Sequence, residues 1–173
     1  MLLTTDLYNI DCVPEVLRPL LDVTYPWEVL KKLDDFTATI RDHRAGEVHP
    51  TAVLEGNIYL HETASIGPHA YVEGPAWIGE GATVGHGAYV RGGVVLAPNA
   101  KVGHATEVKR SLFLVDAKAP HLNYVGDSVL GHKVNIGDDG LSRCDVARHY
   151  SCGFGCQNAP SVGNHSEDLK LQN

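Results

Sequence analysis

The chain has 173 residues, 43% of them hydrophobic and only 7% aromatic, which is enough for one domain with an aliphatic core. Its formal net charge of -7 argues against nucleic-acid binding, which requires a basic stripe. No apolar run approaches the roughly 18 residues that span a membrane, and the first residues lack the pattern of a signal peptide. We therefore expect a cytoplasmic protein that binds neither nucleic acid nor membranes.

Residues 1–47 show no fixed repeat and are expected to form an N-terminal arm. Pro14 and Pro19 interrupt the apolar stretch 12–23, which is at best a short helix or an extended segment. Residues 24–33 predict the start of a helix, with Pro26 in the first turn and Leu30 and Leu33 on one face. This segment could cover the open end of the domain that follows, whose edge strands would otherwise invite aggregation.

A repeat of six residues begins at Leu54. Every sixth residue is aliphatic at eleven consecutive positions: Leu54, Leu60, Ile66, Val72, Ile78, Val84, Val90, Leu96, Val102, Val108 and Leu114. The residue four places after each of the first nine is small or β-branched, and six of these nine are alanine. A period of six fits neither a helix nor a simple strand. The pattern predicts an all-β domain over residues 48–137, a parallel β-helix of three-sided coils with the aliphatic residues inside and the small residues at the corners.

The repeat changes phase near its end. Val108 and Leu130 are 22 residues apart, which is not a multiple of six, and a break of this kind predicts a loop or a site over residues 116–127. Residues 138–173 have no period and are expected to form an irregular or disordered tail, which is either a natural cap or a frame-shifted or truncated version of a longer chain. Three cysteines in this tail, Cys144, Cys152 and Cys156, do not have the spacing of a zinc site, so we expect no metal.

A family resemblance rests on three stretches at residues 103–111, 117–128 and 134–137, and above all on Lys-Ala-Pro-His-Leu-Asn-Tyr-Val-Gly-Asp at 118–127. They resemble the acetyltransferase domain of the bifunctional N-acetylglucosamine-1-phosphate uridylyltransferase/glucosamine-1-phosphate acetyltransferase. They are even more similar to the β-helical domain of archaeal sugar-phosphate nucleotidyltransferase-like proteins. The resemblance implies left-handed coils, a homotrimer with sites between subunits, acetyl-CoA as co-substrate and an amino-sugar phosphate as acceptor.

The resemblance also implies roles for individual residues. His121 matches the catalytic base, and an imidazole suits proton transfer near neutral pH. Arg91 and Lys109 match the sugar-phosphate ligands, while Tyr124 and Asn135 match residues that hydrogen-bond the sugar and its amine side. The family continues after the position of Gly137 with further coils that carry much of the acetyl-CoA groove, whereas here the repeat stops.

Each assignment has an alternative. His121 could be a surface turn residue, Arg91 and Lys109 solvated charges, Tyr124 a packing residue at the phase change, and Asn135 part of a turn-stabilising ladder. Three functions therefore stay open: an acetyltransferase for an amino-sugar phosphate, a non-catalytic sugar-phosphate-binding module, and a structural trimerisation unit.

Overall fold

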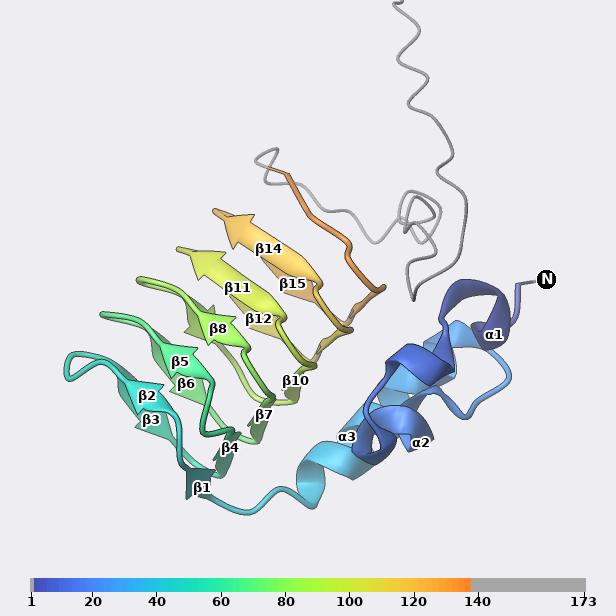
Figure 1. The fold of residues 1–173 in the computed structure, drawn as a ribbon, viewed down its shortest axis with the longest axis horizontal. Coiled ribbons are helices and arrows are strands. Elements are labelled where there is room, and N and C mark those ends of the chain that lie inside the picture. Colours follow the sequence, from blue (N-terminus) through green and yellow to red (C-terminus); the bar gives the residue numbers. More distant parts are fainter. Residues whose placement is uncertain (1, 138–173) are drawn as a thin grey trace, which may run out of the picture.

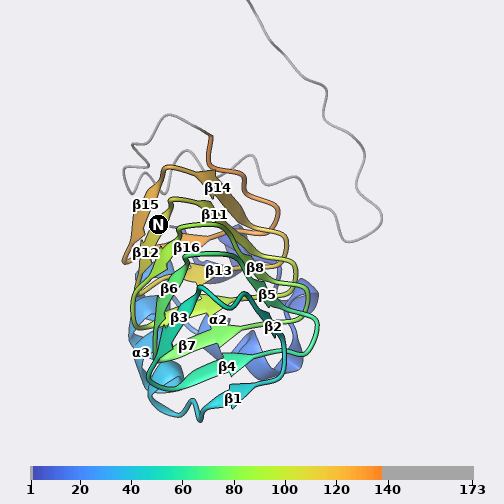
Figure 2. The same cartoon turned by 90° about the vertical axis from the view of Figure 1, so that its left-hand side faces the viewer.

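The computed structural model describes residues 2–137, so the tail from residue 138, with its three cysteines, lies outside the described residues. The chain winds into a stack of three-sided coils, and each side contributes one strand per coil to a parallel sheet (Figures 1 and 2). Sheet 1 contains β1 (His43–Arg44), β4 (Ile58–Leu60), β7 (Ala76–Ile78), β10 (Val94–Leu96), β13 (Leu112–Phe113) and β16 (Val129–Leu130). Sheet 2 contains β2 (Glu47–Val48), β5 (Ser65–Ile66), β8 (Thr83–Val84), β11 (Lys101–His104) and β14 (Lys118–His121). Sheet 3 contains β3 (Val53–Glu55), β6 (Tyr71–Glu73), β9 (Tyr89–Val90), β12 (Glu107–Lys109) and β15 (Tyr124–Gly126). The parallel β-helix expected from the hexapeptides is therefore confirmed.

The interior of the coils is aliphatic, as the repeat predicts. Side chains at successive strand positions alternate between inside and outside, and the hexapeptide places one large aliphatic residue inside each strand. Ile78 and Val90 are fully buried in this core, and Ala82 and Ala88 fill the tight corners beside them. The core of the β-helix thus follows directly from the six-residue pattern.

The phase change has a simple structural cause, which is a shortened corner between sheets 3 and 1. Trp77 pairs with Val95 at a spacing of 18 residues, but Val95 pairs with Leu112 at a spacing of 17, and Leu112 pairs with Val129 at 17 again. One residue is missing from the corner in each of the last two coils. Residues 116–127 consequently continue sheets 2 and 3 as β14 and β15, and the loop predicted there does not form.

The shortened corner also reverses one inward assignment. Because the corner before β13 is one residue shorter, Phe113 enters the interior and Leu114 faces outward from sheet 1. The prediction that Leu114 points into the coil is therefore wrong. Leu114 is still fully buried, because helices cover this sheet.

The N-terminal arm is helical and packs against the side of the β-helix. It contains α1 (Thr4–Leu7), α2 (Arg18–Leu21), α3 (Val29–Ala38) and the short 3₁₀ turns η1 (Ile10–Cys12), η2 (Glu15–Leu17) and η3 (Pro26–Glu28). Val29 and Leu33 of α3 share a buried cluster with Val95 and Leu112 of sheet 1. Figure 1 shows the helices beside this sheet, so the expectation that the arm covers the open end is wrong. Within residues 2–137, no helix has the length and apolar character needed to cross a membrane.

Candidate functional site

Arg91 and Lys109 lie side by side on the outer face of sheet 3. The residues before them, Val90 and Val108, are in register in β9 and β12, and both are fully buried. Because side chains alternate along a strand, the next residue in each strand points outward. The structure therefore brings the two predicted phosphate ligands together on neighbouring strands.

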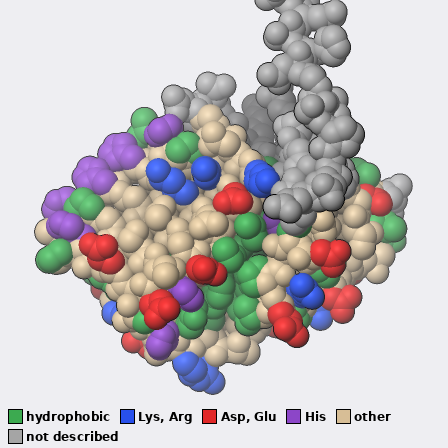
Figure 3. Space-filling model, in the orientation of Figure 1, with side chains coloured by type: hydrophobic (Ala, Val, Ile, Leu, Met, Phe, Trp, Pro, Cys, Tyr) green, Lys and Arg blue, Asp and Glu red, His purple; other side chains and the backbone are tan. Residues whose placement is uncertain are grey.

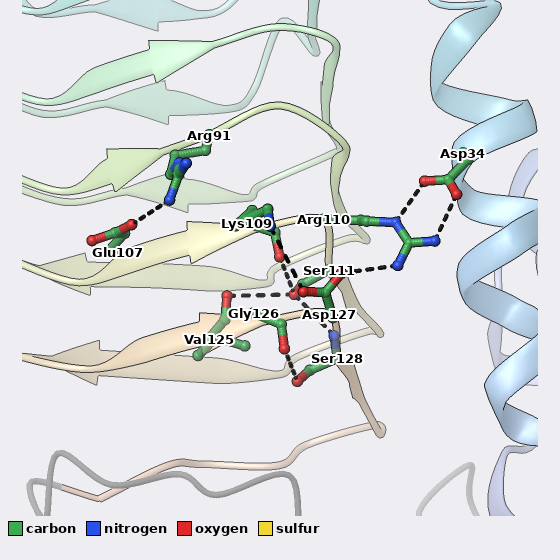
Figure 4. Close-up of polar contacts among 10 residues, drawn as sticks. All are labelled: Asp34, Arg91, Glu107, Lys109, Arg110, Ser111, Val125, Gly126, Asp127 and Ser128. Carbon is green, nitrogen blue, oxygen red and sulfur yellow. Dashed lines mark hydrogen bonds and ion pairs between the residues drawn. The ribbon is translucent and has the colours of Figure 1, made fainter.

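Each of these two cations has an acidic partner (Figure 4). Nη1 of Arg91 donates a hydrogen bond to Oε1 of Glu107 at 3.0 Å, and this carboxylate raises the pKa of Arg91. Nζ of Lys109 lies 3.9 Å from Oδ2 of Asp127. All four side chains are 38–47% exposed, so these are surface ion pairs that an anionic ligand can displace at low cost.

Tyr124 lies next to this pair of cations. It begins β15 in register with Glu107, and it is 49% exposed. Its ring folds over Gly126, where an added Cβ would come within 2.7 Å of the phenol oxygen. Gly126 is in register with Lys109, so the missing side chain at Gly126 leaves room for the Tyr124 hydroxyl beside the Lys109 strand.

His121 lies at the corner between sheets 2 and 3, at the end of β14. It is exposed and in register with His104, whose ring stacks on that of His86 with centroids 5.0 Å apart. Figure 3 shows a row of histidines along one edge of the β-helix, with other histidines elsewhere on the same face. Among residues 2–137, no three His, Cys, Asp or Glu side chains are grouped so as to hold a metal ion.

Asn123 holds this corner from the inside. The equivalent corner position is alanine at Ala70 and Ala88, whereas Asn123 is only 3% exposed and its Nδ2 donates to the backbone oxygen of His121 at 2.7 Å. Leu122, between His121 and Asn123, adopts a positive φ of 46°. The buried amide thus fixes the backbone that carries His121 on one side and Tyr124 on the other.

Asn135 lies apart from the other four predicted residues. It forms an isolated parallel bridge with Lys118, which places it at the edge of sheet 2. Arg91, Lys109 and Tyr124 are on sheet 3, and His121 is at the corner where that sheet begins. The structure therefore places Arg91, Lys109 and Tyr124 on one sheet, with His121 at the other end of its strands from the two cations, and leaves Asn135 on a different face.

Four residues that contact the predicted residues or their neighbours were not predicted from the sequence: Glu107, Arg110, Asn123 and Asp127. A signal for two of them was present. At the corners of sheet 3 the lower coils carry glycine, as at Gly56 and Gly93, and in the last two coils Arg110 and Asp127 take over these corners. A charged residue at a corner where other coils have glycine is therefore the signal in the sequence that distinguishes Arg110 and Asp127.

Comparisons with known proteins agree with this architecture. The family model described as the GMPPB C-terminal domain matches residues 54–141, about half of the chain. Proteins described as the bifunctional protein GlmU are similar over 116 residues, which is 67% of this chain: 53% identical in Methanococcus maripaludis strain C7, 39% in Methanocaldococcus jannaschii and 37% in Methanococcus vannielii. The aligned region covers only 28% of the length of these relatives.

Proposed function

This chain belongs to the GMPPB C-terminal domain family. Because it is also similar to the GlmU proteins, we propose that it is an acetyltransferase that acts on an amino-sugar phosphate such as glucosamine 1-phosphate. One observation carries the proposal: Arg91 and Lys109 are neighbours at one end of the sheet 3 strands, and the Tyr124 ring reaches over Gly126 beside Lys109. His121 lies beyond Tyr124, at the corner where these strands begin. Neighbouring strands lie about 4.8 Å apart, a spacing at which two cations can share one phosphate dianion.

On binding, the phosphate would replace two carboxylates as the ion-pair partner of the two cations. Glu107 and Asp127 hold Arg91 and Lys109 in place, and a dianion that bridges the cations replaces two weak surface ion pairs with charge-assisted hydrogen bonds. The Tyr124 hydroxyl, next to the Lys109 strand, is placed to hydrogen-bond the sugar. Binding of this kind weakens as salt concentration rises.

His121 is proposed to act as the base. Its imidazole accepts a proton from the amine as the amine nitrogen attacks the thioester carbonyl of acetyl-CoA; a C–N bond forms, the C–S bond breaks, and the proton goes on to the departing thiolate. Lys101 and Lys118 are in register on the outer face of sheet 2 and are both exposed, so they offer cations for the phosphates of acetyl-CoA.

A homotrimer would complete the site. Among residues 2–137 the helical arm covers sheet 1, so sheets 2 and 3 are the faces of this part of the chain that we propose for neighbouring subunits. Asn135 on sheet 2 of one subunit can reach the sugar amine only if a neighbour brings that face to sheet 3 of another. The separation of Asn135 from the other four residues therefore supports a site shared between subunits.

Calorimetry with glucosamine 1-phosphate, followed by a thiol-release assay with acetyl-CoA, tests the proposal. We expect the parent chain to bind the sugar phosphate, and Lys109→Ala to lose that binding. Lys31→Ala, which removes an equal charge from an exposed position on α3, is the control and should bind like the parent. Absence of binding by the parent chain would refute the proposal.

A second candidate is a non-catalytic sugar-phosphate-binding or trimerisation module. The observation in its favour is that residues 54–141 match the family model of the GMPPB C-terminal domain. Binding of the sugar phosphate without any release of thiol would identify the binding module. A trimer that binds no sugar phosphate would identify the structural unit.

A further inference from the structure

Arg110 connects the helical arm to the candidate phosphate site (Figure 4). Its Nε and Nη2 donate to Oδ1 and Oδ2 of Asp34 in α3, at 2.8 and 2.6 Å, and its Nη1 donates to Oδ1 of Asp127 at 2.8 Å. The other oxygen of the Asp127 carboxylate is the one that faces Lys109 at 3.9 Å. Four alternating charges, Asp34, Arg110, Asp127 and Lys109, thus form a continuous chain from α3 to sheet 3.

The corner that holds this chain of charges is built at a cost in backbone strain. Arg110 and Asp127 have positive φ values of 43° and 47°, a region that non-glycine residues rarely adopt. Lower in the stack, Gly56 and Gly93 take positive φ values at the same corner. Hydrogen bonds from the Ser111 and Ser128 hydroxyls to the carbonyl oxygens of Lys109 and Gly126, both 2.7–2.8 Å, support the two shortened turns.

Arg110 pairs more strongly with Asp34 than with Asp127, and this difference affects Lys109. Asp34 receives two hydrogen bonds from Arg110, whereas Asp127 receives one, so the guanidinium is drawn mainly toward α3. The first cause of the lowered pKa of Asp34 is its hydrogen bond with Arg110. Because Arg110 is held mainly by Asp34, the Asp127 carboxylate pairs only partly with Arg110 and also attracts Lys109.

We propose that Asp34 and Arg110 are positioning residues that set how much positive charge Lys109 presents to a phosphate ligand, so that the docked arm tunes the anion affinity of sheet 3. This inference rests on the proposed function. When Asp34 is neutral, Arg110 turns to Asp127 and releases Lys109 for the ligand. When Arg110 is neutral, Asp127 pairs with Lys109 alone and two carboxylates remain near the site.

The two substitutions therefore have opposite effects on binding. By calorimetry with glucosamine 1-phosphate at low salt, Asp34→Asn is expected to bind roughly threefold more tightly than the parent chain, and Arg110→Gln roughly threefold more weakly. Both differences should shrink at high salt. Both variants should melt at a lower temperature, because each loses the contact between α3 and the β-helix.

Asp42→Asn is the matched control. Asp42 pairs with Arg44 at 2.9 Å, and the side-chain exposures of that pair, 50% and 34%, match those of Asp34 and Arg110, at 49% and 34%. The control changes the net charge equally at the first coil, far along the stack from Lys109, and should leave the affinity unchanged.

Three results would overturn the inference. If both variants bound the sugar phosphate with the affinity of the parent chain, Asp34 and Arg110 would serve only to hold α3 against the β-helix. If the affinity changed in the same direction in both variants, the cause would be a general loss of order. If the parent chain bound no sugar phosphate, the proposed function would fail and this inference would fail with it. If the parent chain bound the sugar phosphate and both variants bound it with the same affinity as the parent, only this inference would fail and the proposed function would stand.

Discussion

At the scale of residues, two departures from the regular repeat lie at the corner between sheets 3 and 1. Arg110 and Asp127 keep a left-handed backbone where lower coils use glycine, at a cost of about 1 kcal/mol each. The hydrogen bonds that Arg110 makes to two carboxylates offset part of this cost. Charged side chains are thus retained at positions where glycine is the easier choice.

The pairing of Asp34 predicts a pH dependence of stability. Its pKa is lower in the folded chain than in the unfolded chain, so its contribution is present above the unfolded value and is lost as the pH falls through the folded value. Because both side chains are partly exposed, we expect Asp34→Asn to cost only about 0.5–1 kcal/mol at pH 7. Urea unfolding should show this difference from the parent shrinking below about pH 4. A difference that stayed constant down to pH 3 would contradict the prediction.

His121 carries the kinetic prediction. If it is the base, His121→Ala lowers turnover by about 10²–10⁴-fold and leaves sugar-phosphate binding largely intact. Lys109→Ala should instead raise the Michaelis constant, because it removes a contact made in the ground state as well. His86→Ala is the control, since His86 is an exposed histidine on the same edge of the β-helix. If the His86 and His121 variants had equal activity, His121 would not be the catalytic base.

At the scale of elements, each strand contributes one aliphatic side chain to a narrow interior. Ile78→Ala should cost about 2–5 kcal/mol by leaving a cavity. Ala82→Leu should cost about 1–3 kcal/mol by overpacking a corner that is fully buried. Denaturant unfolding measures both, and Val53→Ala, at a side chain 45% exposed, should change stability little. Parent-like stability of both core variants would contradict the inward register.

The sequence predicted the coils well wherever the six-residue period held. From Leu60 to Val108, the residues assigned to the interior are buried in the structure. The prediction failed at Leu114 because a single missing residue at a corner exchanges the inner and outer faces of the next strand. The position of the arm also failed, since an apolar helix face does not specify which of several apolar surfaces it will cover.

The candidate site was predictable to the extent that it follows the period. Arg91 and Lys109 are 18 residues apart, which is one coil, so the repeat alone places them side by side. The pairing of Asp34 with Arg110 joins residues 76 positions apart and has no periodic signal. The inward turn of Asn123 also breaks the pattern, because it puts an amide where the repeat has alanine.

At the scale of the whole molecule, the helices of residues 2–137 pack on sheet 1, and within these residues no helix covers sheets 2 and 3. We expect three copies to associate through these faces, in the arrangement that the family resemblance implies. Analytical ultracentrifugation should give three times the 18.7 kDa mass of the chain. A strictly monomeric species would contradict a site shared between subunits, although the fold itself would stand.

The docking of α3 on β10 and β13 has a consequence for the order in which the chain folds during synthesis. Each coil needs only the coil before it, so the stack can grow as the polypeptide emerges from the ribosome. The arm emerges before the coils, and its partners Val95 and Leu112 are made some 60 to 80 residues after Val29 and Leu33. We therefore expect the apolar side of the arm to remain uncovered until most of the coils exist, so that a segment synthesised before the coils reaches its final place only after them.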